Sequence, residues 1–291
     1  MGQAVPSGVG LKRAGIALFI FGMLLYAAAG DVEENPLAIG SPLVSIAGAL
    51  VYFRGRQQAA RARAESSSSP LRDGKPQVLY LRSFTTDPST LFKQAASAFT
   101  TEEEQLADVL RPFGELIAIG RPGEKLPLPG AVRMYATDAE WQQLVIDRMR
   151  SAPLVVIRAG VGAGISWEVG QAFSTLSPAR ILILVLNLKA DEYRVFADEV
   201  RQHTRIVLPA IGEGSLLKAI VDVRYGASKA PPGFVMFSDD WSPAFLPFPF
   251  TPIRIGFNDM KMAFNLALRP VFERHGLEWH PARRFDRSTP Q

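Results

Sequence analysis

The pattern of hydrophobic and polar positions divides the chain into an apolar N-terminal part and a longer region in which apolar runs alternate with amphipathic segments. Two uncharged apolar stretches come first, AGIALFIFGMLLYAAA (14–29) and PLAIGSPLVSIAGALVYF (36–53). At about 1.5 Å per residue, helices over these stretches reach ~24–27 Å, slightly short of the ~30 Å hydrocarbon core of a bilayer. Because Lys12 and Arg54 can extend toward the headgroups, we expect a transmembrane helical hairpin.

The charges around these stretches predict their orientation. Lys12 and Arg13 precede the first stretch, four arginines follow the second between residues 54 and 63, and the connection DVEEN (31–35) is acidic. The positive-inside tendency then predicts a multi-pass protein of the inner (cytoplasmic) membrane with both ends in the cytoplasm. Two alternatives stay open, namely a pair of buried core helices, or a cleavable signal peptide ending near residues 27–29 and followed by a stop-transfer segment. The signal-peptide alternative also leaves the large C-terminal domain in the cytoplasm.

From residue 77 onward, short apolar runs alternate with amphipathic segments. The runs that we predict as strands are 78–84, 115–120, 153–160, 181–187 and 205–210. The segments that we predict as helices are 101–113, 138–151, 166–176, 191–203 and 214–223. The alternation predicts βαβ units, and strands that are apolar on both faces indicate a parallel sheet covered on both sides. We therefore expect a doubly wound α/β domain over residues 76–225.

Helix starts are also predicted. Thr101 followed by Glu104 is typical of a capping box, and Asp138 is expected to begin the next helix. Ser166 is expected to be the N-cap of the helix that follows the third strand.

Two further segments flank this domain. Residues 54–75 form a basic, serine-rich linker whose arginines either contact anionic lipid headgroups or stay solvated. Residues 226–291 form a proline- and aromatic-rich extension that ends in a predicted helix at 260–276. We expect the extension to pack on the sheet edge, with a lid or a homo-oligomer contact as alternatives.

Charge and composition exclude several function classes. The chain has 32 basic and 28 acidic residues, and residues 54–75 hold six of the former and two of the latter, so the whole excess lies in the linker. The α/β domain is therefore electrically balanced, and we expect no nucleic-acid partner. With no cysteine and three scattered histidines, we also expect no metal site.

A glycine-rich turn, RAGVGAGIS (158–166), connects the third predicted strand to its helix. Ligands of doubly wound sheets bind outside the carboxyl ends of the strands, so this turn and the loops 82–87 and 120–135 are the candidate binding loops. Glycines there allow backbone N–H groups to approach an anion. The turn is not a dinucleotide fingerprint, because Ile165 stands where the third glycine is required, and the chain has no P-loop motif.

Glu168 is the candidate catalytic residue. With Ser166 as N-cap, it falls in the first helical turn, where an acidic residue is favoured by the helix dipole alone. A carboxylate at the mouth of a parallel sheet can also attack or stabilise a developing oxocarbenium centre. Position alone leaves both interpretations open.

The stretch GAGISWEVGQAFS resembles the motif of nucleoside 2-deoxyribosyltransferases, in which a small-residue turn leads into a helix with a glutamate, a hydrophobe, a glycine, any residue and an alanine. These positions are here Glu168, Val169, Gly170, Gln171 and Ala172. The opening strand VLYLRSF is also similar to that family's first strand, through its tyrosine-leucine pair and the aromatic that follows. The related Toll/interleukin-1 receptor (TIR) domains, many of which cleave NAD, share the flavodoxin-like layout, so the resemblance implies a flavodoxin-like, doubly wound sheet. In TIR domains the glutamate usually follows a tryptophan by several residues, whereas Trp167 and Glu168 are adjacent here.

The resemblance covers about residues 77–210 and implies chemistry on an N-glycosidic bond. Glu168 would be the nucleophile or the oxocarbenium stabiliser at the ribose anomeric carbon, and Asp87 would hold ribose hydroxyls. Arginines near the strand ends suit phosphate groups, and Trp167 can stack on a base. The candidate substrate-binding residues are Tyr80, Arg82, Ser83, Asp87, Arg121, Arg133, Arg158, Gly162, Gly164, Ser166 and Trp167.

Two function classes follow. The first is a membrane-anchored cytosolic N-glycosidase or glycosyltransferase that acts on NAD or a related nucleotide and needs no cofactor. The second is a non-catalytic membrane-tethered nucleotide sensor or self-associating scaffold that uses the same pocket.

Overall fold

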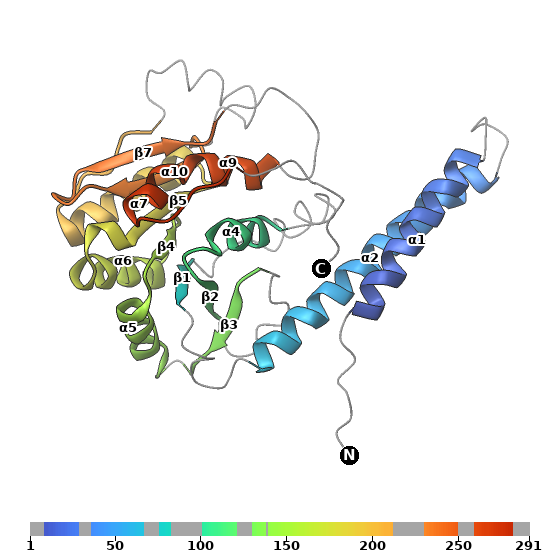
Figure 1. The fold of residues 1–291 in the computed structure, drawn as a ribbon, viewed down its shortest axis with the longest axis horizontal. Helices are drawn as coiled ribbons and strands as arrows, with labels where there is room; N and C mark the ends of the chain where they lie inside the picture. The colour runs from blue at the N-terminus through green and yellow to red at the C-terminus, as the bar shows by residue number, and fades with distance from the viewer. Residues whose placement is uncertain are drawn as a thin grey trace.

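The computed structural model describes residues 9–28, 36–66, 76–82, 101–120, 130–137, 139–211, 230–249 and 259–281. These residues form an α/β protein with two N-terminal helices (Figure 1). The helices are α1 (Val9–Ala28), α2 (Pro36–Ser66), α4 (Glu102–Leu110), α5 (Trp141–Ser151), α6 (Ala163–Thr175), the 3-10 helix η1 (Pro178–Arg180), α7 (Ala190–Thr204), α9 (Asp259–Ala267) and α10 (Arg269–Arg274). The strands are β1 (Gln77–Leu81), β2 (Glu115–Gly120), β3 (Val132–Tyr135), β4 (Val155–Arg158), β5 (Ile181–Val185), β6 (Gly233–Phe237) and β7 (Pro243–Pro247).

The seven strands form one mixed sheet in the order β3-β2-β1-β4-β5-β6-β7. The first five in this order pair in parallel, and β6 and β7 pair antiparallel at the far side. In the centre of the sheet, Tyr80 of β1 lies opposite Ala118 of β2 on one side and Val156 of β4 on the other. The sheet is therefore mostly parallel, as the alternating pattern predicts.

Helices cover the sheet on both faces because the central strands are apolar on both sides. One core cluster joins residues of α5, α6 and α7 to the odd-numbered side chains of β1 and β4, such as Leu79 and Val155. The other joins residues of α4, α9 and α10 to the even-numbered ones, such as Tyr80 and Val156. All five residues of β5 are buried, which shows that this strand has no solvent face.

The connections place a topological switch point between β1 and β4. The chain returns from β1 to β2 with α4 on one face of the sheet, and from β4 to β5 with α6 on the opposite face. The carboxyl ends of β1 and β4 therefore lie side by side while their connections diverge. Ligands of open α/β sheets bind at such a point.

The C-terminal region continues the sheet past residue 225, where we expected the α/β domain to end. β6 pairs with β5 along four residue pairs, from Leu182 opposite Met236 to Val185 opposite Gly233. β7 is the edge strand and carries Pro243 and Pro247, which is where proline is tolerated in a sheet. The sheet edge is thus completed by a segment that the sequence pattern assigned to an extension.

Several expectations differ from the structure. Residues 54–66, expected to belong to a flexible linker, continue helix α2. Residues 205–210 were predicted as a strand but are irregular, since β6 occupies that side of β5 and Pro209 has no N–H to donate. β3 was not predicted, because its four residues lie within a candidate loop and only one of them is fully buried. The helix expected over 260–276 is divided into α9 and α10, with a proline in the first turn of α10. The helix predicted at 214–223 lies outside the described residues.

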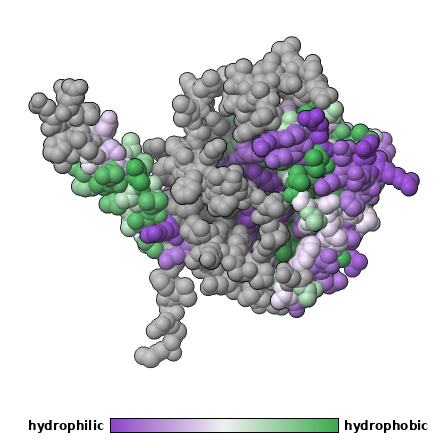
Figure 2. Space-filling model, turned by 180° about the vertical axis from the view of Figure 1, so that it is seen from behind, coloured by the Kyte–Doolittle hydropathy of each residue, from purple (hydrophilic) through white to green (hydrophobic). Residues whose placement is uncertain are grey.

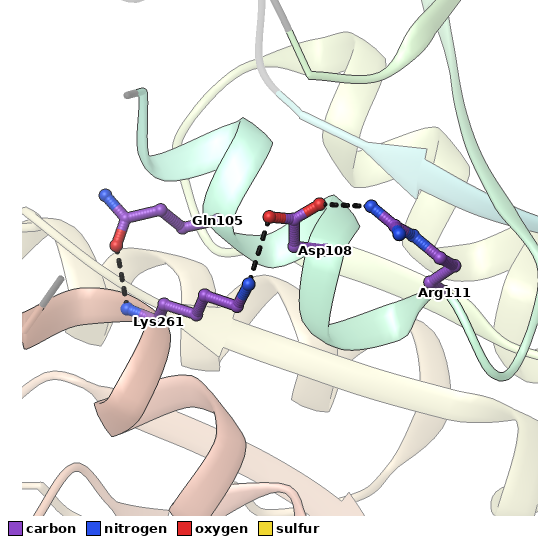
Figure 3. A network of polar contacts seen from close by, with 4 residues as sticks. All are labelled: Gln105, Asp108, Arg111 and Lys261. Carbon is purple, nitrogen blue, oxygen red and sulfur yellow. Dashed lines mark hydrogen bonds and ion pairs between the residues drawn. The ribbon is translucent and has the colours of Figure 1, made fainter. Parts of the chain in front are cut away.

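Helix α4 begins as predicted and connects the C-terminal helices to the sheet. Thr101 accepts a hydrogen bond from the Glu104 backbone N–H at 3.2 Å, and the Glu104 carboxylate accepts one from the Thr101 backbone N–H at 2.9 Å. Figure 3 shows the side of α4 that faces α9: the Lys261 backbone N–H donates to Gln105, and its ammonium group lies 3.1 Å from the Asp108 carboxylate. The α5 N-cap is Glu140, two residues after the expected Asp138, which lies outside the described residues.

The N-terminal helices α1 and α2 pack against each other through glycines, since a Cβ added at Gly15 would collide with the backbone of Tyr52. Hydrophobic side chains gather on the outer surface of this pair, among them Phe21, Leu24 and Leu43 (Figure 2). By length and composition, α1 is able to cross a membrane over Gly10–Ala28, whereas the apolar part of α2, Gly40–Tyr52, is shorter.

A chain that ends after residue 225 will not form a stable α/β domain, because β5 then loses its neighbour β6 and α4 loses α9. We expect aggregation and the loss of a cooperative thermal transition, measured by sedimentation and circular dichroism on detergent-solubilised protein. A chain that ends after residue 281 keeps every described element and serves as the control. A cooperative transition in the shorter chain would contradict the role of β6 in completing the sheet.

Candidate functional site

The candidate site lies at the carboxyl edge of the sheet, by which we mean the edge where the parallel strands β1 to β5 end. Two charged networks and the first turns of α6 meet the sheet there. The two networks join residues of the strands β1, β3 and β4 to the first turn of α4, so the topology brings together positions that are far apart in the sequence.

The first network is centred on Arg158, the last residue of β4. Its guanidinium lies 3.5 Å from the Glu102 carboxylate at the start of α4, and it donates to the Leu186 carbonyl at 3.4 Å. Asn187, after β5, donates to the same carboxylate at 2.7 Å. Tyr80 is buried beside Arg158 and shares a hydrogen bond with it; burial raises the pKa of the phenol, against the opposing positive charge of Arg158. The arginine is thus held by an acidic and a phenolic partner.

The second network is a buried ion pair between Arg133 of β3 and Glu103 of α4. The two side chains are 2% and 6% exposed and 2.7 Å apart. The same carboxylate accepts a hydrogen bond from the Ala131 backbone N–H at 3.0 Å. Gly130 makes this approach possible, because its φ of +137° disfavours other residues and an added Cβ would lie 2.6 Å from the backbone of α4. The pair therefore fixes β3 against α4.

Helix α6 begins earlier than predicted. Its N-cap is Gly162, with a φ of +144°, and no side chain caps the helix. Ser166 is consequently not the N-cap but a residue within the helix. Gly164 lies in the first turn, where an added Cβ would meet nothing within 4 Å, so this second glycine is not required by space.

Glu168 accordingly lies in the second turn of α6 and not in the first. It is five residues beyond the helix start, ~7.5 Å along the axis, where the dipole of the helix end contributes little. The explanation of Glu168 as a residue that stabilises a helix start is therefore wrong.

The side chain of Glu168 points into the core layer between α6 and the sheet. It is 4% exposed and belongs to the buried face of α6, together with Ile165, Val169 and Ala172. No hydrogen bond or ion pair joins its carboxylate to another residue in the described part of the chain. Burial raises the pKa of Glu168 from 4.5 to about 8. A strongly perturbed titratable group near a strand mouth is a candidate for function.

Trp167 and Ser166 have partners on neighbouring helices. Trp167 packs edge-to-face on Trp141, the first residue of α5, with ring centroids 4.8 Å apart. Ser166 Oγ lies 3.0 Å from His203 Nε2 at the end of α7. The tryptophan pair joins α6 to α5, whereas Ser166 is turned toward α7.

The predicted site residues therefore divide between the two faces of the sheet. Tyr80, Arg133 and Arg158 lie on the side of α4, and Glu168 lies on the side of α6. Arg82 follows β1, is half-buried, and lies close enough to Tyr80 for its charge to lower the pKa of the phenol. Ser83, Asp87 and Arg121 lie outside the described residues.

Sequence reasoning missed the acidic partners of the arginines. The capping box of Thr101 and Glu104 assigns no role to Glu102 and Glu103, although three consecutive glutamates at the start of a helix are a signal for pairing with nearby cations. The pairing of Ser166 with His203 was also missed, because it joins residues 37 positions apart on two helices.

In the described part of the chain, no group of three or more metal-ligating side chains is placed to hold a metal ion. No protein-family model, curated protein or solved structure matches this chain. The chemistry that the site can perform has to be inferred from its own side chains.

Replacing Glu168 by glutamine will change the pH dependence of stability. Because the folded-state pKa is about 8 and the ordinary value 4.5, the folded state binds more protons between these values, so the free energy of unfolding falls as pH rises through this window. At pH 7 the free energy of unfolding is lower by ~3 kcal/mol than it is below pH 4.5, because each pH unit in this window lowers it by about 1.4 kcal/mol. Glutamine does not ionise, so Glu168→Gln removes this pH dependence. The difference in melting temperature between the variant and the wild type should therefore increase from pH 5 to pH 8 and stay constant above pH 8.

The exposed Glu115→Gln variant is the control and should follow the wild type at every pH. Parallel curves for Glu168→Gln and wild type in thermal denaturation would show that Glu168 is not held in a low-dielectric layer.

Proposed function

We propose that this chain is a membrane-anchored cytosolic N-glycosidase or glycosyltransferase that acts on NAD or a related nucleotide, with Glu168 as nucleophile or oxocarbenium stabiliser. The observation that carries the proposal is a buried carboxyl group that has a pKa of about 8 and no partner among the described residues. It lies on the helix that follows β4, one of the two strands at the switch point where ligands bind in open α/β folds. A flavodoxin-like, doubly wound domain related to nucleoside 2-deoxyribosyltransferases and TIR domains is part of the same proposal. The mostly parallel sheet with helices on both faces supports it.

The charge state of Glu168 favours a cationic substrate. At pH 7 a carboxyl group with a pKa of about 8 is mostly protonated and is a poor nucleophile. A positive charge within ~4–6 Å lowers such a pKa by about 1–3 units, so binding of a nicotinamide ribosyl group would ionise the carboxylate at the place where the oxocarbenium charge develops. A neutral nucleoside supplies no such charge before bond cleavage. The nicotinamide nucleotide is therefore the preferred substrate in this proposal.

Arg158 and Tyr80 are suited to the other half of the ligand. They lie at the switch point on the α4 side, and a guanidinium there suits a pyrophosphate by bidentate hydrogen bonding. Because Arg158 already lies 3.5 Å from Glu102, the phosphate would have to compete with that carboxylate. The gap of 3.5 Å is longer than that of a tight charge-assisted pair, which makes Arg158 easier to redirect than Arg133.

The proposal is tested by incubating the full chain, reconstituted in nanodiscs, with NAD and measuring nicotinamide release by chromatography. We expect turnover that falls by ~10²–10³-fold in Glu168→Gln, because the carboxylate is the group that stabilises the transition state. The wild-type kcat/KM should rise with pH up to about 8, since this parameter reports the ionisation of the free enzyme. Glu115→Gln is the matched control and should retain wild-type turnover. Full turnover in Glu168→Gln would refute the assigned role.

A second candidate function is a non-catalytic nucleotide sensor or self-associating scaffold. The observation in its favour is that Arg133 and Arg158 both have acidic partners on α4, an arrangement that also serves a purely structural edge. Saturable NAD binding by calorimetry without any nicotinamide release would favour this function over the enzyme.

The membrane anchor in the proposal is a helical hairpin formed by α1 and α2, in the inner membrane, with the α/β domain in the cytoplasm. Its support is the apolar surface of the pair and the distribution of charge, with basic residues before the first stretch and after the second. The shorter apolar part of α2 can be accommodated by basic residues at its end, such as Arg54, that reach toward the headgroups.

The natural absence of cysteine makes the orientation testable with single introduced cysteines. A thiol reagent that does not cross membranes should label Glu33→Cys in intact cells expressing the chain, because the connection is expected outside. Asp198→Cys, at an exposed position on α7, should be labelled only after permeabilisation. Labelling of Asp198→Cys in intact cells would contradict the cytoplasmic location.

A further inference from the structure

A pocket of about 370 Å³ lies on the outer side of α6, away from the carboxyl edge. Its walls come from α6, from the end of α7 and from the turn between β6 and β7. The residues that line it are Gly170, Phe173, Ser174, His203, Thr204, Arg205, Ile206 and Trp241. Its volume is at the lower end of the range of about 300–1,000 Å³ found for small-molecule sites.

Gly170 opens the pocket at a cost to its own helix. It lies in the interior of α6, where glycine is less stable than alanine. A Cβ added there would meet only the His203 ring, at 3.7 Å or more, which is ordinary van der Waals contact. Alanine would therefore fit and strengthen the helix, and the missing side chain leaves the edge of the His203 ring accessible from the pocket.

Two further lining residues have backbone conformations that favour glycine. Arg205 ends α7 with a φ of +63°, a position where helices usually carry glycine. Trp241 has a φ of +66° in the turn between β6 and β7, again a position typical of glycine. Among the described residues other than glycine, only Asn187 also has a positive φ, and asparagine tolerates it better. Strained residues of this kind gather at ligand sites.

The chemistry of the walls indicates the class of ligand. Phe173 and Trp241 form an aromatic wall, with ring centroids 5.2 Å apart and planes tilted by 30°. Arg205 supplies positive charge, and His203 supplies a ring whose Nε2 lies 3.0 Å from Ser166 Oγ. No acidic residue lines the pocket, and Glu199, which is close enough to His203 and Ser166 for both to lower its pKa, is not among the lining residues. Arg205 has no ion-pair partner among the residues that the structure describes. We propose that this pocket binds a small aromatic anion, one or two fused rings bearing a carboxylate, with the rings against Trp241 and Phe173 and the carboxylate on Arg205.

This site is separate from Glu168, although both use α6. Two residues along a helix correspond to a rotation of about 200°, so Glu168 faces the sheet while Gly170 faces α7. Trp241 follows β6, which runs antiparallel to β5, and Met236 near the end of β6 lies opposite Leu182 near the start of β5. The pocket thus extends toward the amino edge of the parallel strands, on a different side of α6 from Glu168.

The proposal is tested with 1-naphthoate as the probe, titrated by calorimetry into the full chain in nanodiscs with empty nanodiscs as the blank. We expect saturable binding to the wild type that weakens about tenfold or more in Arg205→Gly, because the carboxylate loses its charged donor. The melting temperature of Arg205→Gly should equal or exceed that of the wild type, because glycine relieves the positive φ. Gly170→Leu should also lose binding, by filling the pocket, and the uncharged 1-naphthamide should bind the wild type about tenfold more weakly.

Arg194→Gln is the matched control, since it removes an exposed positive charge from α7 without touching the pocket. Its affinity for 1-naphthoate should stay within about twofold of the wild type. The proposal is overturned if the wild type shows no saturable binding, or if Arg205→Gly binds 1-naphthoate as tightly as the wild type does. If Gly170→Leu does not fold, the stable Arg205→Gly variant still decides between these outcomes.

Discussion

The burial of the central parallel strands on both faces is the constraint on which the rest of the structure depends. β5 is buried at all five of its positions, and β1 at four of its five. Burying each large aliphatic side chain contributes about 1.5–3 kcal/mol relative to exposure, so neither face of these strands can be left to solvent. Helices must therefore cover both faces, with α5, α6 and α7 on one and α4, α9 and α10 on the other. The change of face from α4 to α6 across β1 and β4 meets this requirement.

The same constraint explains why a carboxyl group on the inner face of α6 has unusual properties. Glu168 occupies a layer that is otherwise made of Ile165, Val169 and other apolar side chains. Without a described partner, its charged form loses hydration and gains nothing in return, which is why burial alone raises its pKa to about 8. A leucine or methionine at this position would fill the layer at no electrostatic cost. Such a local departure from the apolar pattern is typical of a functional residue.

Much of the fold could be predicted from hydrophobic patterning, and the reasons for the failures are physical. The runs at 115–120 and 181–187 were correctly predicted as strands because both are apolar on two faces. β6 was missed because its run, GFVMF, lies among prolines and aromatics, and because its partner β5 is almost fifty residues earlier in the chain. Residues 205–210 have the composition of a strand, but a strand also needs a free neighbour in the sheet. The open side of β5 is occupied by β6.

The candidate site was predictable in its location but not in its geometry. The glycine-rich segment indicated the correct connection between strand and helix. The helix, however, begins after Gly162 and not after Ser166, so Glu168 lies in the second helical turn, where the sequence predicted the first. Successive side chains of a strand point to opposite faces of the sheet. Arg158 of β4 therefore points to the face covered by α4, whereas Glu168 lies on α6, which covers the other face. The acidic partners on α4 depend on tertiary packing, which spacing along the chain does not record.

Helix α6 shows how one element can carry two unrelated demands. Its inner face accepts a carboxyl group that costs ~3 kcal/mol at pH 7, and its outer face accepts a glycine that costs about 1 kcal/mol relative to alanine. Arg205 and Trp241 add the strain of two left-handed backbone positions, of order 1 kcal/mol each or more. A domain with a net stability of about 5–15 kcal/mol tolerates this total only because the two-sided core is large. Glu168 and Gly170 lie on α6 itself, and Arg205 and Trp241 line the pocket against it. A helix that served packing alone would carry neither the buried carboxyl group nor the interior glycine.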